Sequence, residues 1–195
     1  FVDVGLGRPG FLHARDIEVP RVHPGKEIEV PDIRDVLHQG QILLVQVSKD
    51  PFAGKGARLT ANLTVASRFM VFIPGTDHIG ISQRIEDEVE RDLLLEEARS
   101  LCEELGIAGG FIIRTAAENV TREQMRLDMV LLKGVWSRIV TKGREALPRQ
   151  LVYEDLPVHL RVIRDLASSE LTAVLVNDAD THRRVEDYSL EYLPG

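Results

Sequence analysis

The first 66 residues show short alternations of apolar and polar side chains that are typical of β-strands. They predict strands at residues 1–4, 10–13, 41–47 and 57–65, because successive side chains of a strand point to opposite faces of its sheet. Several prolines within residues 14–32 predict a long surface loop between the second and third of these strands. Short strands joined by turns are typical of a small β-barrel, and we expect only part of one here.

The pattern then changes to strands that alternate with helices. The apolar run at residues 68–73 predicts a buried strand. Apolar residues spaced by three and four run from Ile85 to Leu105 and predict a helix, with Ser82 as its N-cap and Gly106 at its end. The acidic residues of this segment would then lie mostly on a solvated helix face.

A second long helix is predicted after a strand at residues 111–115. Thr121 and Gln124 have the spacing of a capping box, and Gly143 is expected to end the helix that they open. The remaining sequence predicts a helix at residues 155–167, a strand at 171–176 and a closing helix from Asp180. This order of elements predicts an α+β protein.

The net charge of −7, from 24 basic and 31 acidic residues, seems at first to argue against nucleic acid as a partner. However, residues 86–104 contain nine acidic and two basic side chains, so this one segment carries the whole surplus. Residues 51–85 contain four basic side chains against Asp77 alone. The acidic total therefore does not exclude an RNA-binding surface elsewhere on the chain.

The sequence favours a reducing, cytoplasmic environment. Cys102 is the single cysteine, so no intrachain disulfide can form. No apolar run is long enough to span a membrane, so we expect no membrane span. The chain opens at Phe1 without a starting methionine or a basic, apolar leader, and we expect it to be a piece of a longer protein.

Lys55 lies between two glycines in a loop that joins two predicted strands. The spacing does not match a mononucleotide-binding loop, which needs another glycine at position 49 and a hydroxyl residue after the lysine. Backbone N–H groups and a positive charge could still bind an RNA phosphate here. The alternative is an ordinary solvated hairpin loop.

Phe1 and Phe11 are the only aromatic residues among the first 50. On exposed faces of a small barrel, such rings stack on unpaired bases. The alternative is that both rings belong to the core. Asp3 and His13 each lie two positions from one phenylalanine and share its face, which favours exposure.

Arg114 and Thr115 end an apolar strand. A guanidinium and a hydroxyl beside free backbone N–H groups would make a compact anion site, although a strand-end arginine paired with a surface acid has the same spacing. Residues 177–182 contain several possible metal ligands. An acidic residue between a strand and a helix is more typical of an N-cap, and we expect no metal site or catalytic grouping in the chain.

The sequence resembles the ribonuclease E/G family of endoribonucleases along essentially its whole length. The matching stretches are FVDVGLGRPGFLH at 1–13, IRDVLHQGQILLVQVSKDPFAGKGARLT at 33–60, SRFMVFIPGTDHIGISQRIE at 67–86, GGFIIRTAAE at 109–118, LKGVW at 132–136 and LVYEDL at 151–156. The resemblance implies three modules. They are most of an OB-fold RNA-binding domain at residues 1–66, a sensor of 5′-monophosphorylated RNA ends at 67–150, and part of a ribonuclease-H-like domain at 151–195.

The resemblance also assigns roles to residues. It implies that Phe1, Phe11 and Lys55 bind single-stranded RNA. It further implies that Arg114, Thr115 and the backbone of Val71 bind the 5′-phosphate. Ala117 stands where some members of the family have glycine, which leaves the shape of the loop after Thr115 open.

The family implies cleavage of single-stranded RNA in rRNA maturation and mRNA decay. It also implies a catalytic Mg²⁺ site, a possible Zn²⁺ site between chains and a homo-oligomer, with both metal sites expected beyond Gly195. We therefore expect a non-catalytic portion of an enzyme. Two alternatives stay open at this point: a non-enzymatic RNA-binding or regulatory module, and a protein-interaction domain that works through the acidic helix.

Overall fold

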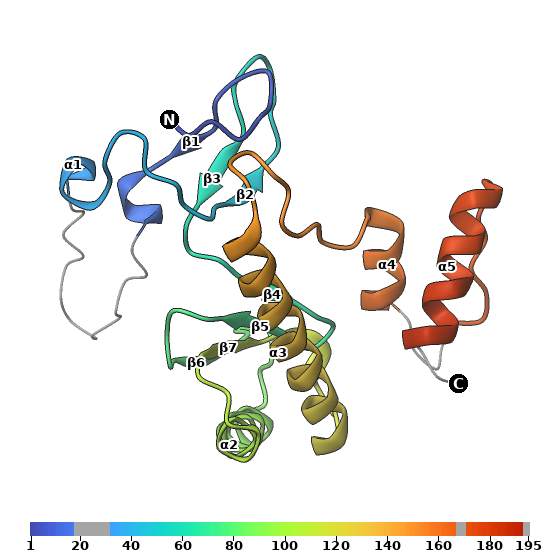
Figure 1. Cartoon of the computed structure of the whole chain (residues 1–195). Helices are drawn as coiled ribbons and strands as arrows, with labels where there is room; N and C mark the ends of the chain where they lie inside the picture. Colours follow the sequence, from blue (N-terminus) through green and yellow to red (C-terminus); the bar gives the residue numbers. More distant parts are fainter. Residues whose placement is uncertain (18–31, 167–170, 193–195) are drawn as a thin grey trace. The chain divides into compact units, whose positions relative to one another are not determined.

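A computed structural model describes residues 1–17, 32–166 and 171–192 of the chain (Figure 1). The chain divides into two compact units, residues 1–152 and residues 153–195. The first unit contains two β-sheets, and the second contains two helices. The predicted α+β class is confirmed, whereas the predicted boundary between residues 66 and 67 stays a prediction.

The first sheet is small and open. It contains β1 (Phe11–Leu12), β3 (Arg58–Thr60) and β2 (Gln46–Lys49) in that order, with β1 parallel to β3 and β3 antiparallel to β2. Two short helical turns, η1 (Ala14–Asp16) and α1 (Ile33–Val36), accompany it. Three buried side chains form its core: Leu12, Ala57 and Leu59. The described residues therefore form an open three-stranded sheet and no closed barrel, and the partial OB-fold stays a prediction.

All four strands predicted in this region are shorter than expected. The strand at residues 10–13 is reduced to Phe11–Leu12, and the strand at residues 57–65 is reduced to Arg58–Thr60, because Val65 belongs to the second sheet. The strand at residues 1–4 is reduced to a single bridge between Val2 and Gly10, because Gly5 turns the chain at a φ of +78°. The strand at residues 41–47 begins only at Gln46. The apolar residues before Gln46 pack against two different clusters, Leu43 on the small core and Leu44 on the larger one described below.

The second sheet contains four strands in the order β4 (Val65–Ala66), β5 (Met70–Ile73), β7 (Gly110–Ile113) and β6 (Ile79–Ile81). β5 is antiparallel to β4 and β7, whereas β6 is parallel to β7. The sequence analysis missed β6, because a three-residue strand with a central glycine has too little alternation to detect. The strands predicted at residues 68–73 and 111–115 are present with small shifts of their ends.

Two long helices, α2 (Glu88–Leu105) and α3 (Arg122–Glu145), cover one face of this sheet. Alternate residues of β5 and β7 are fully buried together with residues from both helices, so the helices pack on the same face. The buried side chains that form this cluster are Val65, Met70, Phe72, Ile85, Leu94, Ala98, Leu101, Phe111, Ile113, Ala117, Met125, Met129, Leu132 and Ile139. Neither helix covers the opposite face of the sheet, so a ligand could bind there.

Some of the predicted helix ends are confirmed by the structure and others are not. The capping box of Thr121 and Gln124 is confirmed, and so is Gly106 as the left-handed end of α2, at a φ of +57°. The predicted N-cap at Ser82 is wrong, because Asp87 accepts the N–H groups of Val89 and Glu90 instead.

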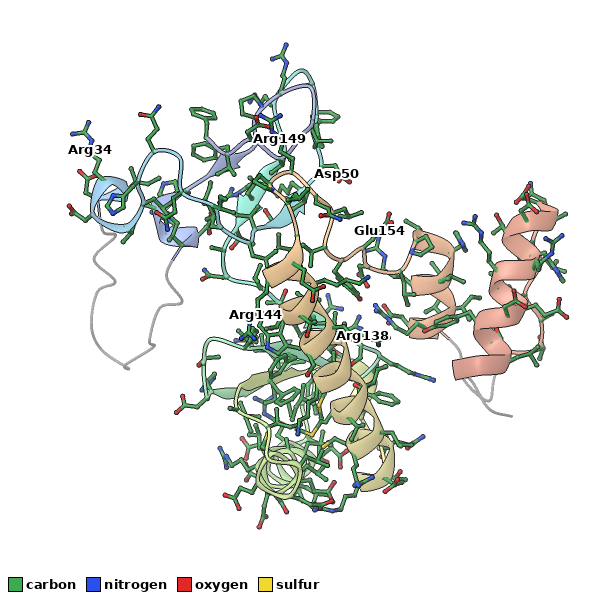
Figure 2. The ribbon with its side chains drawn as sticks, viewed as in Figure 1. Arg34, Asp50, Arg138, Arg144, Arg149 and Glu154 are labelled. Atoms are coloured by element: carbon green, nitrogen blue, oxygen red, sulfur yellow. The ribbon has the colours of Figure 1, made fainter. Side chains whose placement is uncertain are left out.

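Gly143 does not end α3, which continues to Glu145. A Cβ atom at this position would make an ordinary van der Waals contact with the Leu44 side chain, at 3.5 Å, so the end of α3 lies beside the segment that leads into β2. Beyond α3, Arg149 (labelled in Figure 2) forms an ion pair of 2.6 Å with Asp3. These contacts connect the end of the helix to the first sheet.

The second unit contains α4 (Val158–Leu166) and α5 (Ala179–Tyr192). The helices pack against each other, with Ile163 and Val185 buried. The strand predicted at residues 171–176 is wrong. That segment is extended and largely exposed, because no neighbouring strand pairs with it in the described part of this unit.

No helix within the described ranges is both long enough and apolar enough to span a bilayer.

Candidate nucleic-acid interface

Phe1 and Phe11 form an exposed aromatic pair. The bridge between Val2 and Gly10, with N–O distances of 2.9 and 2.8 Å, sets the two phenylalanines side by side on adjacent segments. Their ring centroids are 5.7 Å apart, and Phe1 is 88% exposed. Because Leu12 points the other way into the small core, the interpretation of the two rings as core residues is excluded.

His13 extends this aromatic surface. Its ring lies 6.2 Å from that of Phe11, in a T-shaped arrangement. Such edge-to-face contacts fix the ring plane, which a stacking platform for bases requires.

Lys55 is the last residue of a tight turn that leads into β3. Its backbone N–H donates to Phe52 over 2.9 Å, and the two residues between them have positive φ, at Ala53 and Gly54. The Arg8 guanidinium donates to the carbonyl of Gly54 and so joins this turn to the loop before Phe11. The predicted RNA-binding residues thus lie on two loops that contact each other.

Gly56 allows these two loops to approach each other closely. A Cβ atom at this position would lie 2.0 Å from the carbonyl oxygen of Pro9, so no residue other than glycine fits without a backbone shift. Immediately beyond it, the N–H of Phe11 donates to Ala57 over 2.8 Å. The turn that contains Lys55 is therefore adjacent to the strand that carries Phe11.

The second group of predicted residues lies on the open face of the second sheet. Val71 on β5 is paired with Ile112 on β7, and Ile112 is 41% exposed because both helices cover the other face. Arg114 lies two residues beyond Ile112 and so points to this open side. The structure thus brings Val71 and Arg114 to one surface.

The Arg114 side chain is oriented by backbone carbonyls. Its Nη1 donates to Ser67 over 2.5 Å and to Arg68 over 3.2 Å, while its backbone N–H donates to Phe69 over 2.8 Å. Arg114 is partly buried at the point where β7 ends. Its charge is therefore held at the edge of the sheet instead of extending freely into solvent.

Thr115 begins the short helix η2 (Thr115–Ala117) directly after Arg114. Its hydroxyl lies 3.0 Å from the hydroxyl of Ser82, which follows the parallel strand β6. Ser82 is fixed by its own N–H, which donates to Ile113 over 2.8 Å. Two hydroxyls thus meet at the carboxyl ends of two parallel strands, where ligands of α/β sheets commonly bind, while the guanidinium of the neighbouring Arg114 lies on the carbonyls of Ser67 and Arg68.

Ala117 is fully buried in the core and lies in η2 without a positive φ. The backbone therefore does not require glycine at this position, and the loop after Thr115 forms a regular helical turn.

Three residues beside the site were missed by the sequence analysis: Ser67, Ser82 and Asp128. Ser67 and Ser82 give no signal in a single sequence, because serines are common at strand ends. Asp128 had a detectable signal. It lies on the buried face of α3 between Met125 and Leu132, where an acidic side chain needs polar partners.

Other candidate groups do not form sites. Asp178 accepts the N–H of Thr181 over 2.8 Å at the start of α5, as the N-cap interpretation predicts. Within the described ranges, no cluster of three or more His, Cys, Asp or Glu side chains could hold a metal ion.

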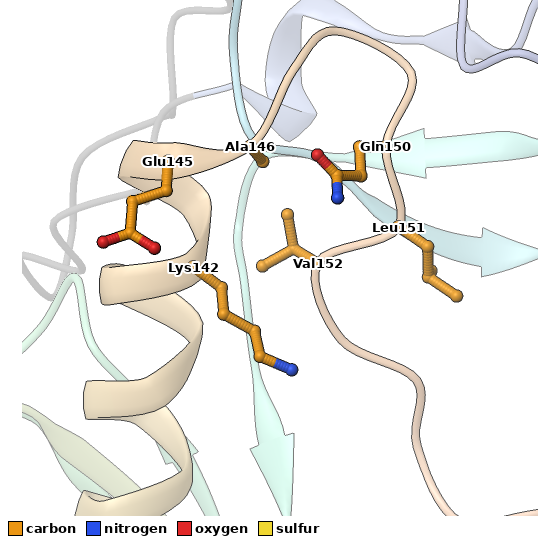
Figure 3. A pocket seen from close by; sticks show the side chains of 6 residues that line it. All are labelled: Lys142, Glu145, Ala146, Gln150, Leu151 and Val152. Atoms are coloured by element: carbon orange, nitrogen blue, oxygen red, sulfur yellow. The ribbon is translucent and has the colours of Figure 1, made fainter.

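A shallow hollow of about 330 Å³ lies at the end of α3 (Figure 3). Lys142 and Glu145 line it from the helix, and Gln150 and Val152 line it from the segment that follows. None of the predicted site residues lies in its wall.

Comparison with known proteins identifies similar sequences. A profile described as "Ribonuclease E/G family" matches residues 64–195. The chain is 42% identical to ribonuclease G of Salmonella typhimurium (strain SL1344) and of Escherichia coli (strain K12), over all of this chain and 40% of each relative. It is 31% identical to ribonuclease E of Nostoc sp., over all of this chain and 28% of that relative. The chain thus spans about two fifths of the length of its ribonuclease G relatives.

Proposed function

This chain belongs to the ribonuclease E/G family, and from that premise we propose that it recognises single-stranded RNA by its 5′-monophosphate. The observation that carries this proposal is the position of Arg114 and Thr115 directly after β7, with the Thr115 hydroxyl 3.0 Å from that of Ser82, which follows β6. Cationic and hydroxyl donors of this kind suit a terminal phosphate.

Arg114 is suited to bind the phosphate through charge-assisted hydrogen bonds. A guanidinium has five N–H donors in a planar fork, a geometry that matches the oxygens of a phosphate. Thr115 adds a hydroxyl, and the backbone of Val71 lies on the same face of the sheet. A 5′-hydroxyl end lacks the negative charge that these donors would bind.

The aromatic pair supports binding of the strand that follows the 5′ end. We propose that unpaired bases stack on Phe1 and Phe11, because both rings are exposed and lie side by side. Lys55 would contact the phosphate backbone from the adjacent turn.

We further propose that this chain is a portion of an endoribonuclease and that the residues that cleave RNA lie outside the described residues. Those residues provide no cluster that fits a catalytic Mg²⁺ or a Zn²⁺ ion, and no step is assigned to either metal. Both metals, the homo-oligomer and the cytoplasmic location stay predictions for the complete protein. The chain itself should not cleave RNA in Mg²⁺, and robust cleavage would overturn that part of the proposal.

The test of the sensor is a binding measurement with two RNAs of identical sequence. We expect the chain to bind the 5′-monophosphorylated RNA about ten-fold more tightly than the 5′-hydroxyl RNA, because the phosphate adds charge-assisted hydrogen bonds. Arg114→Gln should bring the ratio of the two affinities close to one, while the affinity for the 5′-hydroxyl RNA stays nearly unchanged.

Arg138→Gln is the matched control. It removes the same charge from the exposed surface of α3, which covers the opposite face of the sheet (Figure 2). The control should keep the preference for the monophosphate. Equal affinities for both RNAs with the unchanged chain and with Arg114→Gln would contradict the proposal.

A further inference from the structure

Asp128 is an acidic residue at an unusual position. It lies on α3 among the methionine and leucine side chains of the core, and only 8% of its surface is exposed. Burial of a carboxylate is unfavourable unless hydrogen bonds replace the lost water. Its contacts therefore indicate what it stabilises.

The Asp128 carboxylate binds the turn between β4 and β5. Its Oδ2 accepts the hydroxyl of Ser67 over 2.5 Å and the backbone N–H of Phe69 over 3.2 Å. Ser67 also closes the turn, because its backbone N–H donates to the carbonyl of Met70 over 2.9 Å. A side chain of α3 thus fixes the backbone of residues 67–70 from beneath the sheet.

The same turn holds Arg114. The carbonyls of Ser67 and Arg68 accept Nη1 of its guanidinium, and the carbonyl of Phe69 accepts its backbone N–H. Three consecutive carbonyls of a turn that is anchored by Asp128 therefore set both the backbone and the side chain of this arginine.

We propose that Asp128 is a positioning residue for the 5′-phosphate site: it orients Arg114 through the turn at residues 67–70. This inference rests on the proposed function, because it assigns a second residue to the same site. Asp128 lies on the helix side of the sheet and acts on the phosphate through Arg114, without being a ligand itself. The preference for a phosphorylated end thus depends on a helix that the RNA does not touch.

The test is Asp128→Asn, assayed by the ratio of affinities for 5′-monophosphorylated and 5′-hydroxyl RNA. An amide keeps the shape of the side chain but carries no charge and accepts more weakly from Ser67 and Phe69. We expect the ratio to fall about five-fold while the affinity for the 5′-hydroxyl RNA is unchanged. Ser67→Ala, which removes the hydroxyl that donates to Asp128, should also lower the ratio.

Leu132→Ala provides the control for stability. Leu132 lies one helical turn beyond Asp128 in the same core, and its truncation should lower the thermal midpoint at least as much as Asp128→Asn does. It should not change the ratio. If Leu132→Ala lowers the ratio equally, Asp128 has only a structural role and the inference is overturned.

A double variant tests the positioning role of Asp128 separately from the proposed function. In Arg114→Gln, adding Asp128→Asn should change the ratio no further, because the group that Asp128 positions is gone. If the unchanged chain has no preference, the proposed function fails. If it has a preference that Asp128→Asn preserves, only the positioning role fails.

Discussion

Phe11 and Leu12 are neighbours on a two-residue strand, yet they have opposite environments. Leu12 is 2% exposed in the small core, whereas Phe11 is 43% exposed and contacts only other rings and its own sheet. Within one strand, Leu12 therefore contributes buried area to folding, whereas Phe11 is exposed and can contact the RNA that we propose as its ligand.

Phe11→Ala should weaken the affinity for single-stranded 5′-hydroxyl RNA by about 1–3 kcal/mol, because one stacked base is lost. Its free energy of unfolding in urea should change little. Leu12→Ala should instead lower the free energy of unfolding by about 2–4 kcal/mol, because it opens a cavity in the core. A large loss of stability with unchanged RNA affinity in Phe11→Ala would support the interpretation as a core residue.

The residues of the site differ in how much of their role the sequence reveals. The local apolar pattern is enough to place Arg114 and Thr115 at the end of a strand, and β7 does end at Ile113, but their role in binding stays a prediction. The Ser82 hydroxyl could not be assigned to them, because it reaches Thr115 only through the parallel pairing of β6 with β7. That pairing joins segments about 30 residues apart, which no local pattern encodes.

At the scale of elements, the start of α2 depends on Asp87. Ser82 and Asp87 are both good N-cap residues, and the sequence alone favoured the wrong one. Ser82 is unsuitable because its N–H continues the hydrogen bonds of the sheet, whereas Asp87 is the residue that accepts two orphan N–H groups. Long helices were predictable from their periodicity, but their first turns depend on where the sheet ends.

Asp87→Ala should lower the free energy of unfolding by about 1 kcal/mol, because two N–H groups lose their acceptor and the favourable charge at the helix N-terminus is removed. Urea unfolding followed by circular dichroism measures this difference. Asp92→Asn, an exposed position in the same helix, is the control and should cost less. Equal costs for the two variants would indicate that Asp87 does not cap the helix.

At the scale of the first unit, the two sheets have very unequal cores. The first sheet buries Leu12, Ala57 and Leu59, whereas the second buries fourteen side chains with two long helices. Hydrophobic stabilisation grows with the apolar area buried, so the second sheet should be the more stable part. The sequence predicted both groups of strands but gave no measure of this difference.

Hydrogen exchange should therefore separate the two sheets. Backbone N–H groups of β5 and β7 should exchange more slowly than those of β1 and β3, by at least about ten-fold, because opening the larger core costs more free energy. Mass spectrometry of peptides from each sheet measures these rates at one pH. Equal protection of both sheets would mean that they unfold as one cooperative unit.

The parallel pairing of β6 with β7 also has a consequence for how the chain acquires its site. Two parallel neighbours cannot be joined by a hairpin, so α2 must form and cross over before Ser82 can meet Thr115. Contacts between distant segments form late, since closing the intervening chain costs entropy first. The proposed phosphate site should thus be absent from partly folded chains, and a growing chain can acquire it only after residue 115 has been synthesised.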